Sequence, residues 1–180
     1  MVSRLVRRLR SFPLSGLRLR GLALDRAVLA LVLVLLIGFL GGHPAQAASF
    51  DRQNLRMTDL SNQDLRGNDY TRADLAEADL SHANLRGVRL FDTTLSRANL
   101  EGADLTGATI DGARFIQSNL TNAILEGAYA FGTDFRGATI DGADFTDVLL
   151  APKVNAMLCE GAKGTNPVTG RQTRDTLYCP

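Results

Sequence analysis

The sequence has little of what most catalytic and metal sites use. Among its 180 residues there is no Trp, and there are only two His and two Cys. His43 lies in the N-terminal segment, and His82 stands alone, without a second His or a free Cys at the spacing of zinc ligands. We therefore expect neither a metal site nor a bound cofactor.

An excess of basic charge is also missing beyond the N-terminal segment. Residues 1–47 hold seven Arg against one acid, Asp25, whereas residues 48–180 hold 13 Lys or Arg and 18 Asp or Glu, a net charge of 13 − 18 = −5. Nucleic-acid-binding domains usually present a basic face. We therefore do not expect the folded part of the chain to bind nucleic acid.

Only one long apolar run is present, at residues 27–40, and it follows the Arg-rich segment. The sequence GGHPAQA comes next, where Ala45 and Ala47 fit the small-residue pattern of signal cleavage, which predicts a signal peptide at 1–47 and a mature chain from Ala48. An uncleaved anchor is the alternative, but the run is shorter than the roughly 20 residues of a spanning helix. Arg7 and Arg8 leave both twin-arginine and general secretory export open.

An internal repeat of five residues covers most of the remaining chain. From Phe50 to Leu150 every fifth residue is large and apolar except Ala130, and the residue two before it is mostly Ala. A step of five scatters residues around a helix and flips faces along a strand, so the chain must turn once per repeat. If each repeat is one side of a coil, both apolar positions point inward, and Gly two residues after the large one fits the corners. Such a filled interior leaves no substrate cavity.

Repeats such as ADLAE, ADLSH, ANLRG, ANLEG and ADLTG make this sequence resemble the pentapeptide-repeat proteins. The resemblance implies an all-β fold, a right-handed quadrilateral β-helix with four pentapeptides per coil. Residues 48–152 would then form about five coils.

The C-terminal segment 153–180 breaks the repeat and is predicted to cap the solenoid end. Short helices are expected at 154–162 and 173–178. Cys159 and Cys179 would be bridged in an oxidising compartment, which makes the predicted cap disulfide-stapled. The tail, with KGTNPVTG between the cysteines and LYC at its end, also resembles pentapeptide-repeat proteins of the thylakoid lumen in cyanobacteria and chloroplasts.

Outward positions of the repeat carry the remaining functional signals. Asp or Asn often precedes the large residue, which we interpret as local backbone bonding and solubility rather than as a cation site. Exposed apolar groups mark interfaces, and the candidates for an interaction patch are Phe91, Ile116, Ile124, Tyr129 and Phe131. Alternatively, the cap folds over Tyr129 and Phe131, or Phe131 turns inward beside Ala130.

These observations favour a non-enzymatic structural or protein-interaction module exported to the thylakoid lumen or periplasm. Its partner is expected to be another protein, and no stable membrane span is expected after signal cleavage. The alternative, taken from another branch of the family, is a DNA mimic that occupies the DNA site of gyrase, a type II topoisomerase. The export signal, the short rod and the lack of an apolar C-terminal helix for dimerisation count against it. The oligomeric state stays open.

Overall fold

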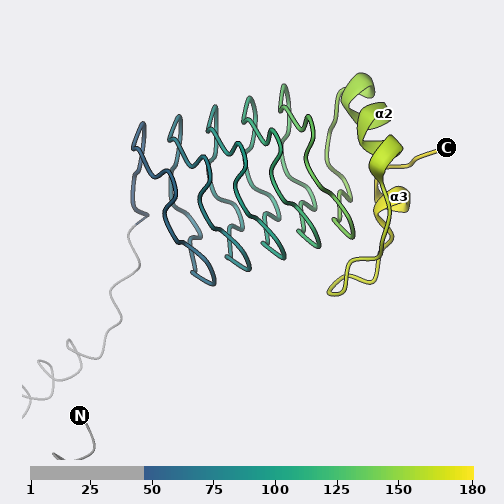
Figure 1. Ribbon diagram of the computed structural model, residues 1–180, viewed down its shortest axis with the longest axis horizontal. Helices are drawn as coiled ribbons and strands as arrows, with labels where there is room; N and C mark the ends of the chain where they lie inside the picture. The colour runs from purple at the N-terminus through teal and green to yellow at the C-terminus, as the bar shows by residue number, and fades with distance from the viewer. Residues whose placement is uncertain (1–46) are drawn as a thin grey trace, which may run out of the picture. The chain divides into compact units, whose positions relative to one another are not determined.

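The computed structural model describes residues 47–180. They form a four-sided solenoid whose coils stack along a single axis, with a small cap at its C-terminal end (Figure 1). The predicted signal peptide, including Ala45, lies outside the described residues apart from Ala47. Ala47 and Ala48 stand directly before the first coil. No helix within residues 47–180 has the length and apolar character needed to cross a membrane.

Each coil takes 20 residues, so four pentapeptides complete one turn. The residue before each large apolar one forms a parallel bridge to the residue 20 positions later, from Ser49–Asp69 to Tyr129–Leu149. The N–H of Leu75 donates to the Thr94 carbonyl at 2.8 Å, and the N–H of Asp74 donates back to Gln53 at 2.9 Å. We number the four sides by their bridging residues in the first coil: side 1 Asn54, side 2 Asp59, side 3 Asp64 and side 4 Ser49.

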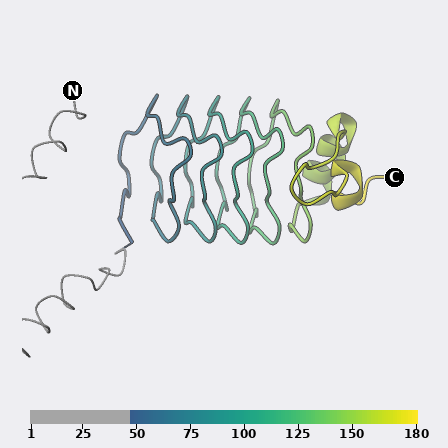
Figure 2. The same ribbon diagram turned by 90° about the horizontal axis from the view of Figure 1, so that it is seen from below.

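The interior is solid and apolar, and the coils remain stacked in register when the molecule is turned by 90° (Figure 2). Residues of the large positions such as Leu75, Leu95 and Phe115 are fully buried, with the small Ala set between them. Aromatic rings stack along two columns, Phe50 on Tyr70 with centroids 4.9 Å apart and Phe115 on Phe135 at 5.3 Å. One large and one small side chain per side fill the square section at protein density.

Corners between sides are held by the Asp and Asn residues of the repeat. The second residue after each large one adopts positive φ whether it is Gly112 (φ 69°) or His82 (φ 56°), and Gly does so at lower cost. The preceding Asp or Asn supports this turn, as where Asp79 Oδ1 accepts the N–H of Ser81 at 2.9 Å. The acidic and amide columns therefore have a local structural task.

The cap consists of α2 (Pro152–Gly161) and α3 (Thr173–Thr176). Helix α2 begins two residues before the predicted 154 because Pro152 suits the first helical turn, so the repeat region ends before residue 152 and not after it. Helix α3 ends at Thr176, short of the predicted 178. Cys159 and Cys179 form a disulfide with Cα atoms 5.6 Å apart.

Candidate interaction surface

Four large apolar residues lie exposed on side 4 and the corner that follows it. Tyr129 is 60% exposed and Leu149 is 78% exposed, and the two are neighbours in one bridging column. Phe131 is 83% exposed and Phe91 37%, both at the position after the large residue of side 4, 40 residues apart. We call Phe91, Tyr129, Phe131 and Leu149 the apolar patch.

The backbone under the apolar patch is fixed by the coil, so the patch is preformed. The Tyr129 N–H donates to Ala108 at 2.9 Å, and the Tyr129 carbonyl accepts the N–H of Ile110 at 2.8 Å. Asp111 lies between Phe91 and Phe131 in its column and accepts the N–H of Phe131 at 2.8 Å. A rigid aromatic surface of this kind binds with little loss of side-chain entropy, because each ring has only two free torsions.

The five residues of the predicted patch do not all lie together. Ile116 and Ile124 are partly buried, Ile116 after the large residue of side 1 and Ile124 on side 3, so neither belongs with Tyr129. The alternative for Phe131 is wrong, because the cap leaves it exposed and Ala130 alone fills the interior position. Leu149 and Met57 (68% exposed) escaped the sequence analysis, although both stand at outward positions of the repeat.

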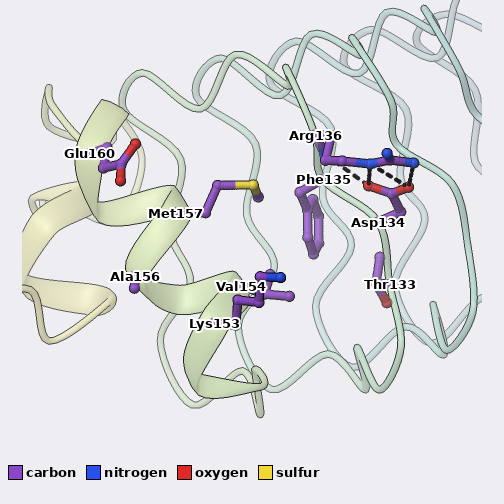
Figure 3. Close-up of a pocket in the computed structure, with 9 residues that line it drawn as sticks. All are labelled: Thr133, Asp134, Phe135, Arg136, Lys153, Val154, Ala156, Met157 and Glu160. Carbon is purple, nitrogen blue, oxygen red and sulfur yellow. Dashed lines mark hydrogen bonds and ion pairs between the residues drawn. The ribbon is translucent and has the colours of Figure 1, made fainter.

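A groove lies between α2 and side 1 of the last coil (Figure 3). Phe135 and Met157 face this groove of about 530 Å³, and Lys153, Arg136 and Glu160 stand at its rim. Arg136 forms an ion pair with Asp134, in which Arg136 Nη2 lies 2.6 Å from Asp134 Oδ2. The hydrogen bond from Arg136 holds the pKa of Asp134 below its usual value, so this carboxylate stays charged and paired at neutral pH.

The polar residues that line the groove are Thr133, Asp134, Arg136, Lys153 and Glu160. Its lining contains no Ser, Cys or His, and the hydroxyl of Thr133 donates to the Ile110 carbonyl at 2.8 Å. The carboxylate of Asp134 is fully engaged by Arg136. Within residues 47–180 no three His, Cys, Asp or Glu side chains gather as a metal site.

A family model for pentapeptide repeats matches eight copies in this chain, over residues 46–81, 71–107 and 110–147. The chain belongs to the pentapeptide repeat family. Members of this family form right-handed quadrilateral β-helices, which agrees with the four-sided coil described above. A search of curated protein sequences finds no match.

Solved structures of the family extend the comparison. A pentapeptide repeat protein from the thylakoid lumen of Arabidopsis thaliana is 42% identical, with a TM-score of 0.70, and the match covers 78% of this chain and 98% of that one. HetL, a pentapeptide repeat protein involved in heterocyst differentiation regulation from the cyanobacterium Nostoc, is 26% identical over 63% of this chain and 51% of its own, with a TM-score of 0.33. The plasmid-mediated fluoroquinolone resistance protein QnrB1 is 20% identical over 57% of this chain and 62% of its own, with a TM-score of 0.25.

The match to the lumenal pentapeptide repeat protein covers more than three quarters of this chain. Its coverage of 98% means that its chain has no large domain that this chain lacks.

Proposed function

We propose that this pentapeptide repeat protein is a non-enzymatic protein-binding module of an exported compartment, the thylakoid lumen in a photosynthetic organism. Cleavage between Ala47 and Ala48 would release the solenoid. The 42% identity to a lumenal protein supports the location, and the Cys159–Cys179 disulfide suits an oxidising compartment.

We propose the apolar patch as the binding surface, because its side chains are exposed to solvent. Three of its four side chains are at least 60% exposed. Aromatic side chains are enriched among the residues that dominate binding energy at protein interfaces. A charged partner is not required, because the patch itself contains no ionisable group other than the Tyr129 phenol.

Binding to a topoisomerase as a DNA mimic gains no support from the electrostatics. Guanidinium groups are interleaved with the acidic columns: Arg89 pairs with Asp69 at 2.7 Å, and Arg86 with Asp104 at 3.0 Å. Arg56 pairs with both Asp74 and Glu77. A phosphate-like array needs rows of unpaired negative charge, and these sides carry mixed charge instead.

The test is capture of the partner by the exported, processed protein in fractionated native cells. Crosslinking mass spectrometry should place partner peptides on Tyr129, Phe131 or Leu149, and a Tyr129→Ser/Phe131→Ser variant should lose them. Met57→Ser is the control, because the exposed fraction of Met57, 68%, lies between those of Tyr129 and Phe131, and Met57 lies at another corner. Crosslinks that survive the double variant, or a chain retained in the cytoplasm with its N-terminus intact, would overturn the proposal.

A further inference from the structure

The N-terminal end of the solenoid presents unsatisfied backbone on all four sides. In each later coil the N–H of the bridging residue donates to the coil before it, as Asp79 donates to Thr58 at 3.0 Å, and its carbonyl accepts from that coil. In the first coil the bridging residues are Ser49, Asn54, Asp59 and Asp64. Within residues 47–180 their four N–H groups and four carbonyls have no hydrogen-bond partner.

The interior of the coil is also open at this end. Phe50, Leu55 and Leu60 are only partly buried, whereas Leu75 and Leu80, one coil later on sides 1 and 2, are fully buried. An exposed strand edge next to exposed apolar groups is a surface that proteins normally cover. The first coil therefore has the properties of an interface.

The arrangement of the free groups indicates the kind of strand that fits. Each of the four residues directs both its N–H and its carbonyl off the end of the coil, since the flanking groups bond to the second coil. In antiparallel pairing, two opposed residues exchange both of these bonds. A second copy turned by a two-fold axis perpendicular to the solenoid presents antiparallel strands on all four sides at once.

We infer that the mature chain forms a head-to-head dimer through its first coil. A lone extended peptide would satisfy one side of the square, whereas another copy of the same coil matches all four sides and the apolar centre. Charge also permits it: residues 48–67 contain three Asp and three Arg, a net charge of zero, although residues 48–180 carry −5. Two first coils therefore meet without net repulsion.

The shape of the end selects one register. The strands of the first coil advance along the solenoid axis like a ramp, from side 4 through sides 1 and 2 to side 3. The end of the solenoid therefore has a single step in height, at the corner between side 3 and side 4 where the chain begins. Two such ramps keep a uniform strand spacing only when their steps coincide, which places the two-fold axis through that corner. The order of the sides is then reversed, so Asn54 faces Asp59 of the partner subunit, and Asp64 faces Ser49 of the partner subunit.

Side-chain charge selects the same register independently. Like charges directly opposite on neighbouring strands are unfavourable. The three other two-fold arrangements of a square each oppose two carboxylates: Asp59 with Asp59, Asp64 with Asp64, or Asp59 with Asp64. Only the register chosen by the ramp sets every bridging carboxylate against an amide or a hydroxyl.

The dimer rests on the cleavage contained in the proposed function, because it needs a chain that begins at Ala48. The Ala48 nitrogen is fixed by Asn68 Oδ1 at 3.0 Å, at the same corner. The ammonium group created by cleavage would therefore stand close to Asp64 of the partner subunit. Processing and dimerisation are linked in this way.

Sedimentation equilibrium of the exported and processed protein tests the inference, with mass spectrometry of the same sample to establish its N-terminus. We expect a dimer. Asn54→Asp places two new pairs of opposed carboxylates in the interface and should weaken dimerisation roughly tenfold. Asn54→Asp/Asp59→Asn exchanges the two side chains across the pair and should restore it. Both residues accept a local N–H that either side chain can accept, so folding is preserved.

Thr94→Asp is the matched control, since it adds the same charge on side 1 two coils away, and it should leave dimerisation unchanged. A protein that stays monomeric at the highest attainable concentration would overturn the inference. So would an Asn54→Asp variant that dimerises as tightly as the native protein, or an Asn54→Asp/Asp59→Asn variant that does not regain dimerisation. An N-terminus other than Ala48 would count against the cleavage in the proposed function and is read separately by mass.

Discussion

The two ends of this solenoid are closed in different ways. At the C-terminal end Phe145 and Phe135 are 1% exposed, whereas Phe50 at the N-terminal end remains partly buried. The tail supplies hydrogen-bond acceptors to the backbone of the last coil. The Gly142 N–H donates to the Lys163 carbonyl at 2.8 Å, and the Phe145 N–H donates to the side-chain Oγ1 of Thr176 at 3.1 Å. The first coil has no such segment within residues 47–180.

The comparison teaches how much chain is needed to close a β-helix end. The cap takes residues 151–180, and its tail supplies specific groups to specific gaps in the coil edge. Asn166 is fully buried and donates from Nδ2 to the Gly142 carbonyl at 2.9 Å and the Asn122 carbonyl at 3.0 Å. Its Oδ1 accepts the N–H of Val168 at 2.9 Å, which holds the turn that carries it. Covering apolar surface alone would leave these carbonyls buried and unpaired.

The largest expected effect comes from matched core truncations at the two ends. Phe145→Ala should lower the free energy of unfolding by about 3–5 kcal/mol, because it leaves a cavity beneath the cap. Phe50→Ala should cost about half as much, since Phe50 already contacts solvent. Urea denaturation of both variants measures the difference, and equal losses would show that the N-terminal end is as well covered as the C-terminal end. If the head-to-head dimer forms, the two losses should converge at high protein concentration.

Reduction of the disulfide should loosen the capped end alone. The bridge closes a loop of 19 residues between Cys159 and Cys179, worth about 3 kcal/mol in the chain-entropy model. Amide exchange under reducing conditions should accelerate in residues 152–179 and stay slow in the first coils. Uniform acceleration along the whole rod would contradict this separation of cap and coils.

Removal of the Asn166 side chain tests the capping bonds themselves. Asn166→Ala leaves the Asn122 and Gly142 carbonyls without a donor and should cost about 1–3 kcal/mol of unfolding free energy. Asn54→Ala, measured at concentrations at which the protein is monomeric, is the control at the open end, because Asn54 is then exposed and its side chain accepts only the Arg56 N–H, at 3.2 Å. That change should cost a few tenths of a kcal/mol. Comparable losses in the two variants would deny Asn166 a special role.

Much of the fold follows from sequence because the repeat overdetermines it. The five-residue period, the inward Leu and Ala positions and the corner residues all agree, so one misplaced residue such as Ala130 does not shift the register. The corner signal was incomplete, however, because His82 and Arg52 adopt the same positive φ as the glycines. Asp and Asn side chains stabilise these turns, which a search for Gly alone overlooks.

The surface and the cap were less predictable, for physical reasons. In the sequence, Leu149 and Leu150 are two adjacent apolar residues at the end of the repeat. Only the coil geometry shows that Leu150 points inward and Leu149 outward. The tail residues that close the last coil, Asn166, Arg171 and Thr176, are common polar types with no repeat to reveal them. Their roles depend on which carbonyls and N–H groups the last coil leaves free, a property of the folded edge and not of the local sequence.

The smallest expected effect is an acid response confined to the capped end. Burial of Asp144 opposes its ionisation, but hydrogen bonds from Thr146 and the charge of Arg171 prevail and hold the pKa of Asp144 below its ordinary value of 3.8. Arg171 Nη1 lies 3.1 Å from Asp144 Oδ2 and 2.8 Å from Glu126 Oε2, so these pairs join tail to coil. A carboxyl with a lowered folded-state pKa contributes stability above 3.8, and this stability is lost as the pH falls through the folded pKa.

Acid titration should therefore release residues 163–177 before the coils unfold, and the protection of their amides, as exchange between pH 5 and pH 3 corrected for its intrinsic pH dependence, measures it. Asp59 at the open end also has a lowered pKa, because it accepts a hydrogen bond from the Ser61 N–H. It is exposed, however, and does not contact the tail. Asp144→Asn should flatten the pH dependence of cap exchange, while Asp59→Asn should leave it unchanged. If the protection of the cap in the native chain does not change with pH, the Arg171 contacts position the tail without stabilising it, and the other contacts of the tail hold this end closed.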